Sequence, residues 1–257
     1  MNDIKKAFEN GKALIPFITA GDPSLAVTEQ LLIEMSKNGA DIIAIGIPFS
    51  DPIAEGVAIQ EADLRALAAG TTTDKIFEMV KSIRQQIECE LAVMSYMNPV
   101  FVYGVDKFME RCAECGISAV IVPDTPYEEK AELSGACDAN NVSLISMIAP
   151  TSEDRIQMIA KDAQGFLFCI PSLGVAGVKS STTAQDIDCM VGMVRSVSDI
   201  PCAIGFGVAD KEQAKLAAQT ADGMIIGSEV VEIIGKHGES CIEPVINYLK
   251  ALKAAMI

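Results

Sequence analysis

The sequence is poor in the residues that build metal centres. His237 is the only histidine among 257 residues, so a site made of several imidazoles is excluded. Of the eight cysteines, only Cys112 and Cys115 have the C-x-x-C spacing, and a zinc site would need a second such pair. On the helix expected over residues 105–115, we interpret them as one buried thiol and one chance neighbour. No metal site is therefore expected.

Positive charge is also scarce. The 35 acidic residues outnumber the 20 basic ones, and the net charge of -15 would repel nucleic acids and anionic membranes. No apolar run is long enough for a transmembrane helix, and the first residues lack an apolar signal region. Since the cysteines are scattered as well, we expect a reduced, cytoplasmic protein that binds anions through local dipoles.

Apolar residues make up half of the sequence, which suits one large domain. Runs of strand length alternate with amphipathic stretches of helical length, a pattern typical of parallel βαβ units. The expected strands are residues 13–20, 41–47, 91–96, 119–123, 143–148, 165–170, 201–204 and 223–226. The expected helices are residues 25–38, 73–87, 105–115, 127–140, 152–163, 184–197 and 211–220.

Eight such units predict an α/β fold, a single-domain TIM (β/α)8 barrel over residues 1–257. An open doubly wound sheet is the main alternative, and periodicity alone does not exclude it. That fold normally carries G-x-G-x-x-G after its first strand, whereas Ala20-Gly21-Asp22-Pro23 stands here. The barrel is therefore favoured, with its active site at the carboxyl ends of the strands.

Glycines follow the last two expected strands. Gly205-Phe206-Gly207 follows the seventh, and Gly227-Ser228 follows the eighth at the start of a short helix over residues 228–234. Backbone amides and a helix N-terminus in this order predict a phosphate site that needs no Lys or Arg, although glycines at strand ends can also serve only to turn the chain. Gly177, after the sixth strand, is a third source of amides. The long irregular segments 48–57 and 171–183 are candidate mobile loops over a substrate.

Several segments resemble motifs of the tryptophan synthase alpha subunit family, in the family's order. They are Pro16-Phe17-Ile18-Thr19-Ala20-Gly21-Asp22-Pro23, Gly46-Ile47-Pro48-Phe49-Ser50-Asp51-Pro52, Tyr96-Met97-Asn98-Pro99, Gly174-Val175-Ala176-Gly177, Gly205-Phe206-Gly207 and Gly227-Ser228. The resemblance implies a lyase that cleaves indole-3-glycerol phosphate to indole and glyceraldehyde 3-phosphate by a retro-aldol reaction, without metal or organic cofactor. It also implies a beta-subunit partner in an alpha2-beta2 assembly.

The same resemblance assigns roles to individual residues. The phosphate would be held by Gly177, Gly207, Gly227 and Ser228. The indole pocket would be lined by Phe17, Met94, Tyr96, Ile121 and Phe206. The beta subunit would be faced by Asp51, Pro52, Asn98 and Pro99. Glu55 occupies the loop position at which the family has an Asp that contacts the indole nitrogen, and it is the best catalytic candidate.

Ala44 departs from the family pattern, which has a proton-transferring Glu at this place on the second strand. Ala44 shares a face of that strand with Ile42 and Gly46, and this face is expected to point into the barrel. Alanine cannot transfer a proton. Further departures are Val57, Phe168 and Ala176. Three interpretations remain: an engineered inactivation, a natural paralogue with lost or changed activity, or an enzyme in which Glu55 or water partly substitutes.

Three functions are consistent with these features. The first is an indole-3-glycerol-phosphate lyase whose activity is weak or absent because position 44 has no Glu. The second is a ligand-binding subunit that regulates a beta partner. The third is another phosphate-handling barrel enzyme, which is disfavoured because none of the expected strands contains a lysine for a Schiff base.

Overall fold

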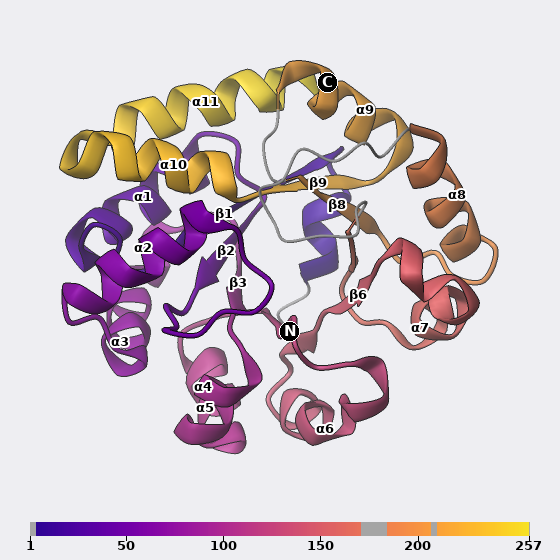
Figure 1. Cartoon of the computed structure of the whole chain (residues 1–257), viewed down its shortest axis with the longest axis horizontal. Helices are drawn as coiled ribbons and strands as arrows, with labels where there is room; N and C mark the ends of the chain where they lie inside the picture. Colours follow the sequence, from indigo (N-terminus) through magenta and orange to yellow (C-terminus); the bar gives the residue numbers. More distant parts are fainter. Residues whose placement is uncertain (1–3, 171–183, 207–209, 257) are drawn as a thin grey trace.

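Parallel strands form a nearly closed barrel inside a ring of helices (Figure 1). The computed structural model describes residues 4–170, 184–206 and 210–256. Along the sheet the strands are β5 (Ser143–Leu144), β4 (Ala119–Ile121), β3 (Glu90–Met94), β2 (Ile42–Gly46), β1 (Ala13–Thr19), β9 (Gly223–Ile226), β8 (Cys202–Phe206), β7 (Leu167–Cys169) and β6 (Ser146–Ile148). The predicted barrel is confirmed, and the open-sheet alternative is not.

The fifth expected strand is divided into two short strands. β5 pairs with β4 and β6 pairs with β7, and the two are separated only by Ile145. The Ile145 amide donates to the Val120 carbonyl at 2.9 Å, so this stretch leaves one neighbour and joins the next within a few residues. The single strand expected over 143–148 therefore contacts both of its neighbours in turn and brings the two ends of the sheet together.

Helices separate the strands along the chain. The described α-helices are α1 (Leu25–Lys37), α2 (Val57–Ala68), α3 (Thr73–Ile83), α4 (Met97–Tyr103), α5 (Val105–Glu114), α6 (Ala131–Ala139), α7 (Ile156–Asp162), α8 (Ala184–Arg195), α9 (Lys211–Thr220), α10 (Ser228–His237) and α11 (Ile242–Ala255). Short 3-10 helices are η1 (Ile4–Phe8), η2 (Arg84–Gln86), η3 (Tyr127–Glu129), η4 (Pro150–Arg155) and η5 (Gly238–Ser240). None of the helices in the described ranges is both long and apolar enough to cross a bilayer.

Most expected helices are confirmed within a few residues, but α2, α4 and α11 were not predicted from the sequence. The short helix expected over 228–234 extends to His237 as α10. The interpretation of the C-x-x-C pair was also wrong in part, because both thiols are buried, that of Cys112 on α5 and that of Cys115 at its C-cap. The Cys115 thiol donates to the Phe77 carbonyl at 3.2 Å. Burial raises the pKa of both Cys112 and Cys115, which disfavours thiolate chemistry.

The barrel interior is filled by alternate residues of the strands. Phe17, Ala44 and Ala92 lie side by side in register, and all three belong to the interior cluster of buried side chains. Ile43 and Ile45 instead pack in the outer cluster beneath the helices. A Cβ atom at Gly46 would lie only 2.5 Å from the Phe17 ring, so a glycine is needed for this ring to fit. The expectation that Ala44 points into the barrel is confirmed.

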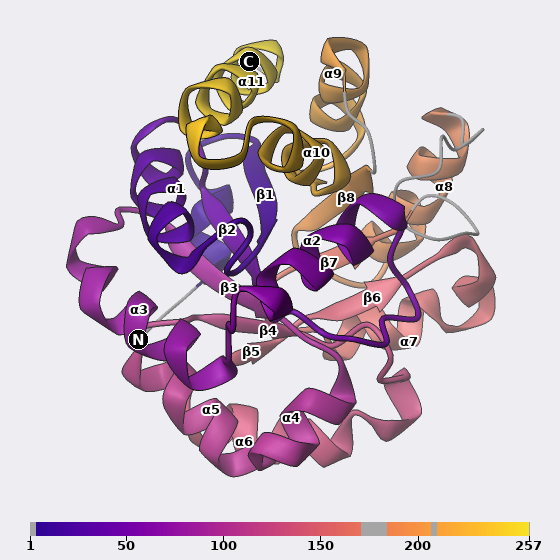
Figure 2. The same ribbon diagram turned by 60° about the vertical axis from the view of Figure 1, so that its left-hand side comes forward.

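Helix α2 covers the end of the barrel at which β1 stops. Its Ile59 and Ala62 side chains join the interior cluster, and the helix contacts β1 and α10. Figure 2 shows α2 lying in front of the strands. Arg65 fixes the helix to the turn after β1 by donating from Nε and Nη2 to the two carboxylate oxygens of Asp22, at 2.7 and 2.8 Å. The helix is thereby held against the turn after β1.

Candidate active site

Glu55 lies in the loop between β2 and α2 and is directed into the protein. Its side chain is only 6% exposed. The loop is held inward by hydrogen bonds on both sides: the Ala54 amide donates to the Tyr96 hydroxyl at 3.0 Å, and the Gln60 side-chain amide donates to the Glu55 carbonyl at 2.7 Å. Among the described residues no group donates to Glu55 Oε2. A buried carboxylate oxygen without a donor is costly and suggests a place for a ligand or a proton.

A second buried carboxyl, that of Asp63 on α2, faces Glu55. Asp63 is 4% exposed. Burial, followed by the negative charge of Glu55 and a hydrogen bond to it, raises the pKa of Asp63 to about 8, against smaller opposing effects of the Phe49 backbone and the Thr19 hydroxyl. Burial also raises the pKa of Glu55, while hydrogen bonds from Asp63 and Tyr96 lower it. Ionisation of both carboxyls together is disfavoured because their like charges repel.

The sequence-based prediction missed Asp63 because it did not include α2. A signal was present in the sequence. Ile59, Ala62 and Ala66 repeat at intervals of three and four residues, which marks the buried face of an amphipathic helix. Asp63 falls on that face, where an acid is rare unless it is paired or functional.

The structure brings together most of the residues expected to line the indole pocket. Phe17, Met94 and Ile121 lie in or against the interior cluster that contains Ala44. Tyr96 is buried just before α4, its hydroxyl accepts from Ala54, and its ring centroid lies 5.5 Å from that of Phe49. Burial raises the pKa of Tyr96, which therefore stays neutral.

Phe206 was expected to follow the seventh strand with Gly205, and this part of the prediction was wrong. β8 runs through both residues because they pair with Ile225 and Ile226 of β9. The side chain of Phe206 lies outside the described part of the chain. A Cβ atom at Gly205 would lie 2.5 Å from the ring of Phe168, so Gly205 makes room for an interior aromatic ring rather than a turn.

Gly227 and Ser228 stand where the prediction placed them, at the start of α10. Gly227 is the N-cap of the helix, and Ser228 is its first residue. Ser228 is 2% exposed, and its hydroxyl has no hydrogen-bond partner in the described structure. A helix N-terminus with a free hydroxyl is suited to an anion, since the backbone amides and the helix dipole both favour negative charge. Gly177 and Gly207 lie outside the described residues.

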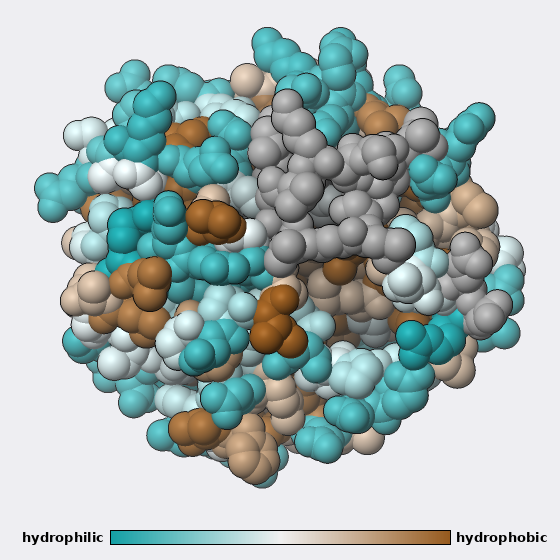
Figure 3. Space-filling view, viewed as in Figure 1, coloured by the Kyte–Doolittle hydropathy of each residue, from teal (hydrophilic) through white to brown (hydrophobic). Residues whose placement is uncertain are grey.

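The residues expected to face a partner lie on two adjoining segments. Asp51 and Asn98 are exposed, while Pro52 and Pro99 are half-buried. The Tyr96 to Ala54 hydrogen bond joins the β2–α2 loop to the start of α4. These segments also expose apolar side chains: Ile53 is 74%, Phe101 68% and Val102 78% exposed. Figure 3 shows apolar side chains standing out on this face of the molecule.

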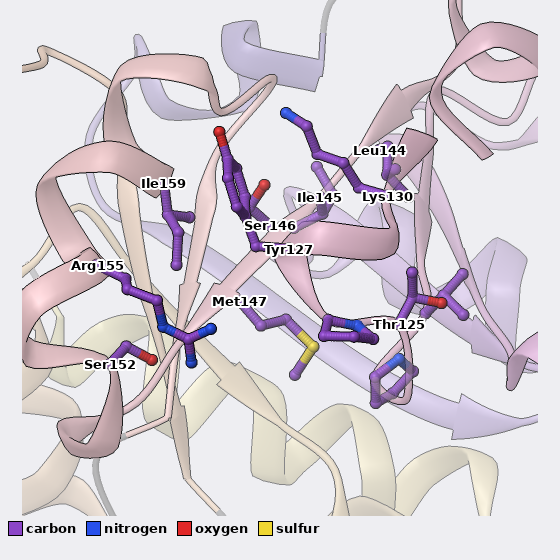
Figure 4. A pocket seen from close by; sticks show the side chains of 13 residues that line it. Thr125, Tyr127, Lys130, Leu144, Ile145, Ser146, Met147, Ser152, Arg155 and Ile159 are labelled. Carbon is purple, nitrogen blue, oxygen red and sulfur yellow. The ribbon is translucent and has the colours of Figure 1, made fainter. Parts of the chain in front are cut away.

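A cavity of about 170 Å³ lies elsewhere, between β4 to β6 and the 3-10 helices η3 and η4 (Figure 4). It is lined by side chains that include Tyr127, Lys130, Met147 and Arg155, and by none of the predicted site residues. Lys130 pairs with Asp162, and Arg155 pairs with Glu128 at 2.6 Å. The positive charges of the two cavity-lining cations are thus already neutralised.

Within the described ranges, no cluster of His, Cys, Asp and Glu could hold a metal ion.

Comparison with known proteins identifies the family of this barrel. Residues 4–256 match the family model for the tryptophan synthase alpha chain. The chain belongs to the tryptophan synthase alpha chain family. The alpha chain of Alkaliphilus metalliredigens is 43% identical over 94% of this chain and 91% of its own length. That of Lacticaseibacillus casei is 37% identical over 100% of this chain and 96% of its own length.

Solved alpha-chain structures have the same fold. The tryptophan synthase alpha subunit of Legionella pneumophila superposes with a TM-score of 0.89 at 32% identity, covering 100% of this chain and 98% of its own. A chain of Mycobacterium tuberculosis tryptophan synthase gives a TM-score of 0.88 at 30% identity, covering 98% and 97%. The family consists of carbon–carbon lyases of tryptophan biosynthesis, and the Glu55–Asp63 pair lies within a barrel of this kind.

Proposed function

We propose that this alpha chain cleaves indole-3-glycerol phosphate to indole and glyceraldehyde 3-phosphate, as a single-domain barrel without metal or organic cofactor. The observation that carries the proposal is the burial of Glu55 at the barrel mouth, with no described group hydrogen-bonded to one of its carboxylate oxygens. A loop acid with no ligand to meet would lower its free energy by turning outward to water. Here the Tyr96 hydroxyl and the Gln60 side chain hold the loop inward.

The reaction makes three demands on the site, and the proposal assigns them to different parts of the barrel. The phosphate is held by the amides of Gly177, Gly207 and Gly227 and by Ser228, whose buried hydroxyl has no hydrogen-bond partner among the described residues. The indole ring lies among Phe17, Met94, Tyr96, Ile121 and Phe206. The Glu55 carboxylate stabilises positive charge at the indole nitrogen when the ring is protonated.

A tryptophan synthase beta subunit is the proposed partner, in an alpha2-beta2 assembly. Asp51, Pro52, Asn98 and Pro99 would face it. The apolar side chains of Ile53, Phe101 and Val102 support this, because exposed groups of this kind gather at protein interfaces. The proposed indole pocket and partner surface adjoin through the Tyr96 to Ala54 hydrogen bond.

A second candidate function is a catalytically impaired subunit that binds the same ligand and regulates the beta subunit. Ala44 favours this alternative. Its methyl group lies in the barrel interior at a position where the family has a proton-transferring Glu, and it cannot carry a proton.

A steady-state assay of indole release tests the proposal. The purified chain is expected to release indole from indole-3-glycerol phosphate alone, and faster with a beta subunit present. The proposal is overturned if the chain binds the substrate and accelerates beta-subunit turnover but releases no indole under either condition. That result would establish the regulatory function.

A further inference from the structure

The Glu55–Asp63 pair has no cationic partner among the residues that the structure describes. Arg65 lies two residues beyond Asp63 on α2, but Asp22 already binds its guanidinium through both carboxylate oxygens. The described residues include no salt bridge to Glu55 or Asp63 with Lys or Arg. Two buried carboxyls without a cation are stable only when a proton lies between them. The protein has thus retained a movable proton at the mouth of the barrel.

The pair lies near the strand end beyond Ala44. Asp63 contacts Thr19 at the end of β1, and Thr19 pairs with Gly46 of β2, two residues beyond the pair Phe17 and Ala44. Two residues of strand correspond to about 7 Å. The Asp63 carboxyl therefore lies near the ends of β1 and β2, about two residues along the strands from Ala44.

We propose that Asp63 is the proton-transfer residue of this lyase, supplied by α2 instead of β2. The inference rests on the proposed function. The protonated Asp63 carboxyl donates its proton to the indole ring carbon that carries the glycerol chain. The resulting Asp63 carboxylate then accepts the proton of the adjacent glycerol hydroxyl. The carbon–carbon bond breaks, its electron pair returns to the indole ring, and the oxygen–hydrogen pair forms the aldehyde carbonyl. Asp63 ends the cycle protonated, as it began.

The chemistry of the two groups is suited to this division of work. A general acid is most effective when its pKa lies near the working pH. Asp63, with its pKa raised to about 8, is protonated at neutral pH and loses the proton when the pH rises further. Glu55, which hydrogen-bonds to Asp63, is the partner assigned to the indole nitrogen. A substitution that removes the carboxyl group of either Asp63 or Glu55 would therefore stop the proton transfer.

The first test replaces the acid by its amide. Asp63→Asn keeps the shape of the side chain, and kcat for indole release is expected to fall about 10²- to 10⁴-fold with little change in KM. Glu61→Gln, which removes an exposed carboxylate from the same helix, is the matched control and should retain the parent rate. In the parent and the control, kcat should decline above about pH 8, where Asp63 loses its proton.

If Asp63→Asn retained the parent kcat, or raised only KM and kept the alkaline decline, Asp63 would have a structural role and the inference would be overturned. Thermal unfolding and binding of an uncleavable indole-alkyl phosphate show whether the variant is folded and can bind ligand.

The second test separates failure of this inference from failure of the proposed function. Ala44→Glu places a carboxyl on β2 instead of α2. If Asp63 is the acid, Ala44→Glu raises indole release about 10²-fold or more in the Asp63→Asn background. The same substitution adds little to the rate of the parent. A parent without activity that gains it through Ala44→Glu overturns the role of Asp63 but supports the lyase site. If neither the parent nor the Ala44→Glu variant releases indole although both bind the uncleavable indole-alkyl phosphate, the proposed function and the inference both fail.

Discussion

Two buried acidic sites lie on or against α2, and their carboxyl groups have opposite kinds of partner. At the turn after β1, Asp22 is 1% exposed and receives both arms of the Arg65 guanidinium. At the barrel mouth, Glu55 and Asp63 are about equally buried but face each other, and no described Lys or Arg pairs with them. Because the carboxyls are about equally buried, burial alone does not distinguish the two sites. They differ in the group that each carboxyl faces, which is a cation at one site and a second carboxyl at the other.

The difference separates a structural charge from a functional one. A bidentate ion pair satisfies both oxygens of Asp22 and fixes the position of α2, so its carboxylate is not available for other chemistry. A pair of like charges destabilises the fold unless it holds a proton, and such strain concentrates at sites where proton transfer is needed. Four substitutions test this contrast, from the largest expected effect to the smallest.

Glu55→Gln is expected to have the largest effect on activity. It keeps the shape of the side chain but removes the carboxylate proposed to stabilise the indole nitrogen, so kcat should fall about 10²- to 10⁴-fold. Removal of the neighbouring negative charge should also lower the pKa of Asp63. The measurement is the pH profile of indole release from pH 5 to 9. A full parental rate in this variant would show that Glu55 is no more than a buried loop acid.

Arg65→Met is expected to have the largest effect on stability. It leaves the Asp22 carboxylate buried without its partner, which typically costs about 3–5 kcal/mol of unfolding free energy, with the lower end expected because Arg65 is 36% exposed. Denaturant unfolding at constant pH measures the loss. The double substitution of Asp22→Asn with Arg65→Met should cost less than Arg65→Met alone. Equal losses would contradict the view that the unpaired charge is responsible.

Asp63→Asn should stabilise the fold at alkaline pH while it lowers activity. The folded pKa of Asp63 is raised, so the folded state holds a proton that the unfolded state releases between about pH 4 and 8, and stability falls as the pH rises through this range. Asn has no such penalty. We expect a gain of about 2–4 kcal/mol at pH 8.5 that shrinks toward pH 4. A gain independent of pH would point to repacking instead of charge.

Ser228→Ala should have the smallest effect. One hydrogen bond to a phosphate contributes about 1.5 kcal/mol or slightly more, so affinity for an uncleavable indole-alkyl phosphate should fall about tenfold in a titration. Ser196→Ala, at an exposed position beyond α8, is the control and should not change binding. Unchanged affinity in Ser228→Ala would mean that the phosphate is held elsewhere.

Local patterns were sufficient for much of the fold and part of the site. The alternation of apolar residues on the second strand predicted the inward orientation of Ala44, because side chains on a strand point to opposite faces in turn. Gly227 and Ser228 were recognised from a turn followed by a helix. These features depend on residues that are neighbours in the chain.

Other features were missed because they depend on contacts between distant segments. β8 extends through Phe206 because β9 supplies pairing partners as far as Ile226. The inward position of Glu55 depends on the Tyr96 hydroxyl, which is 42 residues away from Ala54 in the chain. α2 has only a weak apolar stripe, and its place over the barrel mouth is set by Asp22 and the interior cluster.

The sequence by itself determined the barrel, its family and the absence of a carboxyl at position 44, because period, motif order and side-chain chemistry can be read from the chain directly. Only the tertiary structure decided that Asp63 meets Glu55. That encounter requires α2 to fold back over the ends of the strands, where burial raises the pKa of both groups and the charge of Glu55 raises the pKa of Asp63 further. The residue type alone gives the pKa of an acid in water, while its neighbours in the folded protein decide whether it holds a proton.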